Sequence, residues 1–205
     1  MTVGIEMGLS MGPGAEPARL DLEELLATRL LVQGNSGSGK SHLLRRLLEQ
    51  SAGLVQQVVI DPEGDFVSLS DRYGHVVVEA DGDDAALQAI AARVREHRVS
   101  AVLSLEGLDP EGQMRAAAAF LGGLFDAERE HWYPVLVVVD GEALHENALG
   151  LPDDVPAREG DAEVVGVVGA VLPVSAGRAA GTSSGLAGGR GAADSACASP
   201  LRALP

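Results

Sequence analysis

Residues 34–41 read Gly-Asn-Ser-Gly-Ser-Gly-Lys-Ser and fit the phosphate-binding pattern G-x-x-x-x-G-K-[ST] at every fixed position. The apolar run Thr28–Gln33 precedes this loop and predicts a short buried strand. Residues Ser41–Gln50 follow it, with apolar side chains at helical spacing. A strand, a glycine-rich loop and a helix in this order form an anion site, because backbone N–H groups and the positive end of the helix dipole face the same point.

The loop predicts a site for Mg·ATP. Lys40 is expected to reach the β- and γ-phosphates and to act in catalysis, and Ser41 is expected to ligate Mg²⁺. The predicted nucleotide-binding residues are Gly34, Asn35, Ser36, Gly37, Ser38, Gly39, Lys40, Ser41 and His42. The alternative is a Gly/Ser-rich turn that ends in Lys-Ser and binds no phosphate.

Lys40 is the only lysine in the sequence, and every other member of the 15 Lys and Arg residues is an arginine. A compact ammonium on a thin stem fits inside a loop that is closed around a phosphate, whereas a wide planar guanidinium does not. The composition therefore favours a phosphate-binding role for this one position.

Length and composition restrict the class of protein. The 205 residues suffice for one α/β domain with a sizeable core, and 46% of them are apolar. No apolar run is long enough for a membrane span and the start lacks a signal-peptide pattern, so we expect a cytoplasmic protein without a membrane partner. The single cysteine, Cys197, agrees with a reducing compartment.

The net charge of −15 argues against a broad basic surface for nucleic acid. A local basic channel in an oligomer is still compatible with this charge. The alternative is that the same arginines lie on solvated helix faces. The candidate arginines are Arg45, Arg46, Arg93, Arg95 and Arg98.

Strand and helix patterns alternate along the chain, which predicts an α/β fold with a mostly parallel sheet and helices on both faces. Helices are expected after the loop, over Asp83–Arg98, and from Asp109 to about Glu130. Further strands are expected at Val3–Met7, Val55–Ile60, His75–Val78, Ala101–Leu105 and Val135–Asp140.

The last of these strands is continuously apolar and ends in Asp140. An acid in this position, after a phosphate loop earlier in the chain, is typical of the Walker B element. Asp140 is therefore predicted to hold Mg²⁺ through its water shell and to hydrogen-bond Ser41.

With both elements placed, the chain resembles the HerA/FtsK group of P-loop motor ATPases, in particular HerA-type helicase ATP-binding domains. The resemblance rests on residues 27–41, on Val59–Phe66 with its Ile-Asp-Pro-Glu-Gly-Asp segment, and on Leu136–Asp140. It implies a RecA-like (ASCE) core, ATP hydrolysis coupled to DNA translocation, and a homo-oligomeric ring, a hexamer. In such a ring a neighbouring subunit supplies an arginine, for which Arg72, Arg115 and Arg129 are candidates.

The resemblance ends directly after Asp140. Such ATPases usually continue with a glutamate that polarises the attacking water, whereas this chain has Gly141 followed by Glu142. Glu142 is the predicted general base if Gly141 forms a bulge, because one extra residue would otherwise turn the side chain to the opposite face. Glu63 and Asp65 are the reserve candidates, with an acidic surface turn as their alternative role.

Three segments are expected: a lead-in over residues 1–19, the P-loop core over 20–140, and a Gly/Ala/Pro-rich tail over 141–205. The tail composition is typical of a poorly ordered or non-homologous segment, such as a frameshifted continuation that leaves the core incomplete at its C-terminus. Only Ala162–Val174 in the tail has a strand pattern. The alternatives to a motor are a truncated nucleotide-binding module with little or no turnover and another P-loop enzyme, such as a small-molecule kinase.

Overall fold

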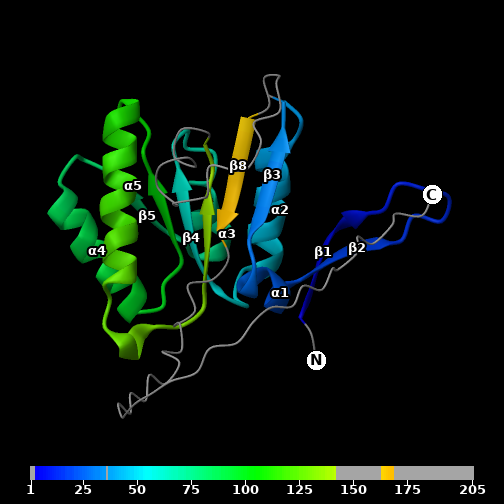
Figure 1. Cartoon of the computed structure of the whole chain (residues 1–205), viewed down its shortest axis with the longest axis horizontal. Helices are drawn as coiled ribbons and strands as arrows, with labels where there is room; N and C mark the ends of the chain where they lie inside the picture. Colours follow the sequence, from blue (N-terminus) through cyan, green and yellow to red (C-terminus); the bar gives the residue numbers. More distant parts are fainter. Residues whose placement is uncertain (1–2, 36, 142–162, 169–205) are drawn as a thin grey trace, which may run out of the picture. The chain divides into compact units, whose positions relative to one another are not determined.

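A six-stranded sheet organises the part of the chain that the computed structural model describes, which is residues 3–35, 37–141 and 163–168 (Figure 1). Its strand order is β3-β8-β7-β4-β6-β5. The strands are β3 (Leu30–Gly34), β4 (Gln56–Asp61), β5 (Val76–Glu79), β6 (Ala101–Ser104), β7 (Val135–Val139) and β8 (Glu163–Val168). Strands β7, β4, β6 and β5 are parallel, whereas β8 runs antiparallel to both of its neighbours. Strand β3 therefore points the same way as β7, and the carboxyl ends of β3, β4 and β7 meet at one edge.

The parallel strands are buried because helices cover both faces of the sheet. All residues of β6 and β7 are buried, as are the last five residues of β4. Such strands read as continuous apolar runs, since neither face meets water. The predicted α/β fold class, with a mostly parallel sheet flanked by helices, is confirmed.

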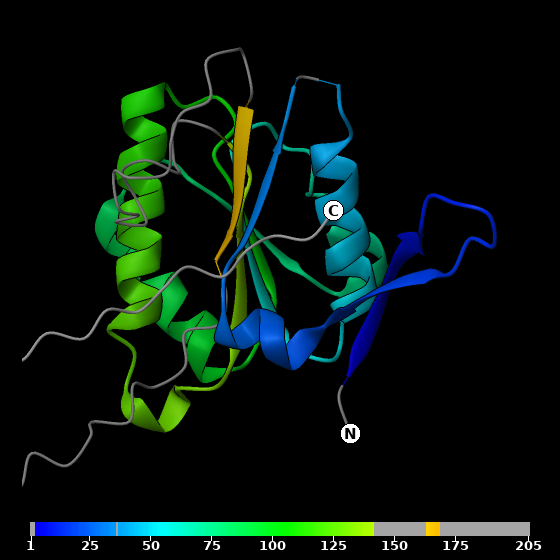
Figure 2. The same cartoon turned by 45° about the vertical axis from the view of Figure 1, so that its right-hand side comes forward.

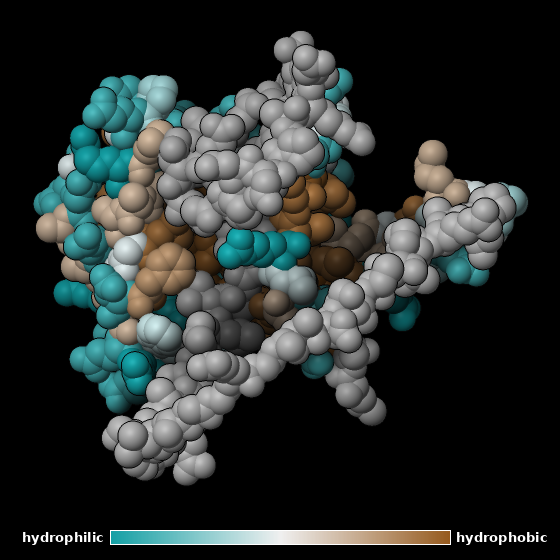
Figure 3. Space-filling model, in the orientation of Figure 1, coloured by the Kyte–Doolittle hydropathy of each residue, from teal (hydrophilic) through white to brown (hydrophobic). Residues whose placement is uncertain are grey.

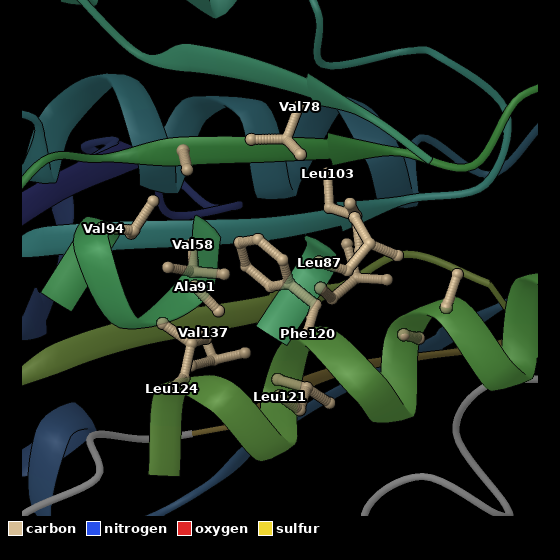
Figure 4. Close-up of a cluster of buried hydrophobic side chains, with 14 of the residues drawn as sticks. Val58, Val78, Leu87, Ala91, Val94, Leu103, Phe120, Leu121, Leu124 and Val137 are labelled. Atoms are coloured by element: carbon tan, nitrogen blue, oxygen red, sulfur yellow. The ribbon is translucent and has the colours of Figure 1, made fainter. Parts of the chain in front are cut away.

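Helices α4 (Asp84–Glu96) and α5 (Pro110–Phe125) cover one face of the sheet (Figure 2). Phe120 of α5 points into the core toward Leu87 of α4 and Val58 of β4 (Figure 4). Gly123 permits the two helices to approach closely, because a Cβ at this position would collide with the carbonyl oxygen of Gln88. The surface over this helix pair carries hydrophilic residues together with apolar patches (Figure 3).

Helix α2 (Lys40–Ser51) lies on the opposite face with α1 (Leu22–Ala27) and α3 (Leu69–Tyr73). Leu44, Leu47 and Leu48 of α2 are fully buried against Val59 and Val138 of the sheet. The amphipathic spacing of α2 thus anchors the helix that begins at the phosphate-binding loop.

A separate hairpin of β1 (Gly4–Leu9) and β2 (Pro17–Asp21) precedes this core. The sequence predicts a strand here only near Val3–Met7 and a loop up to residue 19, so β2 is a correction. The sequence does not predict β2 because it contains Pro17 and lacks apolar alternation. A proline is nevertheless tolerated at the first residue of an edge strand.

Two other expectations need correction. Strand β3 is not buried, because it lies at the end of the strand order and its residues alternate between half-buried and exposed. Helix α5 ends at Phe125 rather than near Glu130, and a short 3₁₀ helix, η1 (Arg129–His131), follows.

No helix within the described ranges is long and apolar enough to cross a membrane.

Candidate functional site

The loop that follows β3 has the backbone of a phosphate-binding turn. Gly37 and Gly39 have φ values of 75° and 92°, in the left-handed region that glycine adopts without strain. A Cβ at Gly34 would collide with the Ser38 hydroxyl, so a side chain there would displace Ser38 in the loop. Gly39 is the N-cap of α2, and no side chain of the described residues caps this helix end. The first N–H groups of α2 are therefore oriented toward the loop, as an anion requires.

Lys40 is buried, with a relative exposure of 8%. Its Nζ donates to the carbonyl oxygens of Gly34, at 2.9 Å, and Asn35, at 3.2 Å. Asn35 also accepts the Ser38 N–H at 3.0 Å, which closes the turn. The ammonium thus lies inside the loop, where the residues present fit a nucleotide phosphate.

Ser41 and Asp140 are brought together from the two halves of the predicted site. The Ser41 side chain hydrogen-bonds the Asp140 carboxylate. Burial raises the pKa of Asp140, the Ser41 hydrogen bond lowers it, and the charges of Asp61, Asp65 and Glu63 raise it again. A hydroxyl and a carboxylate in contact, with further acids around them, are the hard oxygen donors that Mg²⁺ prefers.

Asp61 ends β4, the strand next to β7, and its side chain folds the acidic loop that follows, residues 62–66. Its side chain is 1% exposed, and it accepts the backbone N–H groups of Gly64 and Asp65 at 3.0 Å and of Phe66 at 2.8 Å. Burial raises its pKa, and the three hydrogen bonds partly oppose that rise. Both carboxylate oxygens of Asp61 are thus engaged by the backbone, while Glu63 and Asp65 remain exposed.

Gly141 brings the end of β7 against this acidic loop. The Asp140 N–H donates to the Ile60 carbonyl at 3.1 Å, which extends the pairing of β4 and β7 beyond their last bridge. Gly141 has φ 133°, and a Cβ on it would lie only 3.0 Å from Pro62 Cγ. A side chain directly after Asp140 is therefore strained in this structure.

The remaining predicted residues are placed as follows. Asn35, Gly37, Ser38 and His42 are exposed around the loop. Ser36 and Glu142 lie outside the described residues, so the predicted general base stays a prediction.

One of the arginines considered for a basic channel, Arg95, does not fit that role. Arg95 is fully buried, where Nη1 donates to Tyr133 O at 2.9 Å and to Gln56 Oε1 at 3.3 Å. Arg98 stacks on the Tyr133 ring, with its guanidinium carbon 3.2 Å from the ring centroid. These contacts join the end of α4 to the start of β7, so Arg95 is a core residue rather than a surface cation.

Sequence reasoning missed the contacts of Asp61 and Arg45. The Asp-Pro-Glu-Gly-Asp stretch carried a signal for the first, since an aspartate before a Pro/Gly turn often caps its own loop. Arg45 hydrogen-bonds the acidic loop through the Asp65 carbonyl and Ser68 Oγ. Only the three-dimensional proximity of α2 and this loop reveals that contact.

Comparison with known proteins yields one match. Residues 5–121, more than half of the chain, match the family model described as "Helicase HerA, central domain". The matched range includes the phosphate-binding loop and the acidic loop and ends before Asp140. No curated protein and no solved structure matches the chain.

Proposed function

Since the chain belongs to the family of the HerA helicase central domain, we propose that it binds Mg·ATP at Gly34–Ser41 and hydrolyses it as a DNA-translocating motor ATPase. The observation that carries this proposal is the contact between Ser41 and Asp140 beside the buried Lys40. It unites a phosphate-binding loop with a carboxylate at the end of a parallel strand, the position where ligands bind in open α/β sheets.

Each of these residues has a distinct task in the proposed reaction. Lys40 and the N–H groups at the start of α2 bind and orient the phosphates, and charge neutralisation of this kind supplies most of the catalysis of phosphoryl transfer. Ser41 and Asp140 hold Mg²⁺, directly and through its water shell. The cation also offsets the mutual repulsion of Asp140, Asp61 and Asp65.

The water-orienting group is proposed to be an acid near Asp140. Glu142 is the candidate from the chain order, and Glu63 and Asp65 are the candidates in the described acidic loop. An arginine from a neighbouring copy in a ring would complete the site. Arg72, Arg115 and Arg129 are all exposed, and Arg115 pairs with Asp84 at 3.5 Å.

One observation favours a second function, a nucleotide-binding module with little turnover. Gly141 occupies the position after Asp140, and its backbone and the neighbouring Pro62 disfavour a side chain there. Binding would then persist through Lys40, Ser41 and Asp140 while water activation is slow.

Separate measurements of nucleotide affinity and turnover test both functions. Lys40→Ala loses several charge-assisted hydrogen bonds of about 1.5–3 kcal/mol each, so we expect its affinity for Mg·ATP to fall roughly 100-fold or more. Arg46→Ala, on the same helix, should leave the affinity unchanged. Calorimetric titration measures both variants, and an unchanged affinity of Lys40→Ala would refute the site.

Turnover then separates the two functions. Hydrolysis that increases when DNA is added supports the motor, whereas tight Mg·ATP binding without hydrolysis, with or without DNA, supports the module.

A further inference from the structure

Arg45 connects the helix of the phosphate-binding loop to the acidic loop. It lies one turn after Ser41 on α2, and residues at i and i+4 share one face of a helix. Arg45 Nη2 donates to the Asp65 carbonyl and, at 3.0 Å, to Ser68 Oγ. The same face of α2 therefore contacts Asp140 through Ser41 and the acidic loop through Arg45.

The guanidinium makes a third contact with the same loop. Its central carbon lies 5.7 Å from the centroid of the Phe66 ring, within the range of a cation–π interaction. Phe66 is fully buried, and its N–H binds the Asp61 carboxylate. Arg45 thus contacts the outer side of the acidic loop, and Asp61 binds the backbone N–H groups on its inner side.

The acidic loop lies beside Asp140. Asp61 and Asp140 follow strands that pair in parallel, with Ile60 opposite Val139. Pro62, the next residue of the loop, lies against Gly141. The position of the loop on α2 therefore determines where Glu63 and Asp65 stand relative to the carboxylate that is expected to hold Mg²⁺.

On the basis of the proposed function, we infer that Arg45 is a positioning residue that fixes the acidic loop so that Glu63 and Asp65 support Mg²⁺ beside Ser41 and Asp140. Arg45 itself contacts neither the nucleotide nor the metal in this assignment. Its guanidinium suits the task because it donates several hydrogen bonds in fixed directions and stacks on an aromatic ring, which an ammonium does less well.

The charge and the geometry of Arg45 act on Mg²⁺ in opposite directions. Removal of a positive charge near carboxylates would by itself strengthen Mg²⁺ binding. Release of the loop would weaken it, since loss of an outer-shell partner commonly lowers metal affinity about 10- to 100-fold. The sign of the change therefore distinguishes a positioning role from a simple charge effect.

The test is a Mg²⁺ titration of ATP binding in Arg45→Met and Arg45→Lys. We expect the half-saturating Mg²⁺ concentration to rise about tenfold in Arg45→Met and less in Arg45→Lys, which keeps the charge. ATP affinity in EDTA should stay within about twofold of the wild type, because the phosphate-binding loop is intact. Arg46→Met is the matched control, since the described residues offer Arg46 no hydrogen-bond or ion-pair partner, and it should behave as the wild type.

A double-mutant cycle tests whether Arg45 affects Mg²⁺ binding through Glu63 and Asp65. With Glu63→Gln and Asp65→Asn already present, Arg45→Met should change the Mg²⁺ dependence less than about twofold, because the groups that it positions are gone. A persisting tenfold effect would overturn the assignment. So would stronger Mg²⁺ binding by Arg45→Met, or a lowered melting temperature with unchanged Mg²⁺ dependence.

Two further outcomes separate this inference from the proposed function. If the wild type binds no ATP, the function fails and the role of Arg45 fails with it. If the wild type binds ATP and Arg45→Met shows the same Mg²⁺ dependence, only the role of Arg45 fails. Amide hydrogen exchange gives a readout without nucleotide, in which protection of Gly64, Asp65 and Phe66 should fall in Arg45→Met and persist in Arg46→Met.

Discussion

Asp61 and Asp140 follow neighbouring parallel strands, yet they differ in what holds their carboxylates. Burial raises the pKa of both groups. Asp61 accepts three backbone N–H groups and so shapes the acidic loop, whereas Asp140 meets the Ser41 side chain and a surrounding negative charge. The backbone N–H groups occupy the carboxylate of Asp61, whereas the carboxylate of Asp140 meets only the Ser41 hydrogen bond against that charge, so Asp140 is the one expected to bind a cation.

Asp140→Asn is expected to weaken Mg·ATP binding without lowering the stability of the metal-free protein. A carboxyl group whose pKa is raised in the folded state stabilises below its unfolded pKa, and that contribution is lost as pH rises through the folded pKa. At pH 7 the charged Asp140 therefore destabilises the metal-free wild type, and Asp140→Asn lacks this penalty. The free energy of unfolding of Asp140→Asn, and its midpoint in urea, should be at least as high as those of the wild type.

Mg·ATP should act in the opposite way on the same two proteins. A ligand at 100 times its Kd adds about 2.7 kcal/mol to the stability of the protein that binds it. We expect that gain in the wild type and its loss in Asp140→Asn, measured as the thermal shift on addition of Mg·ATP. A variant that is less stable without metal and shifts fully with Mg·ATP would contradict this role of Asp140.

Gly141→Ala tests the backbone after Asp140. A side chain at φ 133°, with Pro62 Cγ 3.0 Å from the new Cβ, should lower the free energy of unfolding by about 1–3 kcal/mol. Gly122→Ala is the control, because this helical glycine has open space around its Cβ position, and the change should stabilise by about 0.5–1 kcal/mol. Equal effects of the two substitutions in urea unfolding would refute the strain at Gly141.

The sequence predicts the backbone geometry of the Gly34–Ser41 loop well, because its glycines and lysine act through local contacts. The pairing of Ser41 with Asp140 is also predictable, since a carboxylate after an apolar strand has few other roles beside such a loop. The contacts of Arg45, Arg95 and His75 are not predictable, because each depends on which elements lie side by side. The structure gives no account of Glu142, which lies outside the described residues.

At the scale of elements, long periodic segments are predicted and short ones are not. Helices α2 and α4 and strands β4 to β7 agree with their patterns to within a few residues. Helix α3 has only five residues, fewer than two turns, and its position depends on the loop that Asp61 caps. Such an element has no periodicity of its own to detect.

A buried polar network joins three elements at the edge of the sheet opposite the loop. His75 is 5% exposed, and its Nε2 lies 2.8 Å from Gln57 Oε1. The Gln57 amide donates to Leu48 O at 2.9 Å and Ser51 Oγ at 2.8 Å, so its oxygen is left to accept from His75. The network therefore holds the neutral Nε2–H form of the imidazole between α2, β4 and β5.

This network predicts a loss of stability in mild acid. Burial lowers the pKa of His75 from 6.5, with partial opposition from the backbone of Leu69. The unfolded chain then binds the proton first, so the contribution of His75 to stability is constant above pH 6.5 and falls below it by up to 1.36 kcal/mol per pH unit until the folded pKa is reached. The difference in unfolding free energy between the wild type and His75→Gln, measured from pH 5 to 8 in urea, should show this slope. A flat difference would exclude His75 as the titrating group.

At the scale of the whole molecule, β8 connects β3 to the four parallel strands of the sheet. Among the described strands, β3 pairs only with β8, and β8 pairs in turn with β7. The strand that carries the phosphate-binding loop is therefore tied to the strand that ends at Asp140 through Glu163–Val168. The pairing of β3 with β8 joins segments more than 100 residues apart, and no local pattern encodes it, although β8 itself falls within the predicted stretch Ala162–Val174.

Val165→Pro tests this connection. Proline cannot donate to a ladder, and in a central strand it removes at least one hydrogen bond of about 0.5–1.5 kcal/mol net and adds strain. We expect lower stability and weaker ATP binding together, because β3 is no longer held beside β7. Val165→Ile keeps the N–H and should match the wild type in both calorimetry and urea unfolding. Unchanged ATP affinity in Val165→Pro would show that β8 does not support the site.

Because Lys40 is the only lysine in the sequence, a label on lysine side chains would report on the phosphate-binding loop alone. Reductive methylation with ¹³C-formaldehyde would label Lys40 and, besides it, only the amino terminus, so one side-chain resonance would follow the loop directly. Any enzyme that acylates lysine side chains finds a single target here, at the bottom of the phosphate-binding loop. Such a modification would remove the ammonium on which the proposed phosphate binding depends, and we expect a bound nucleotide to shield it.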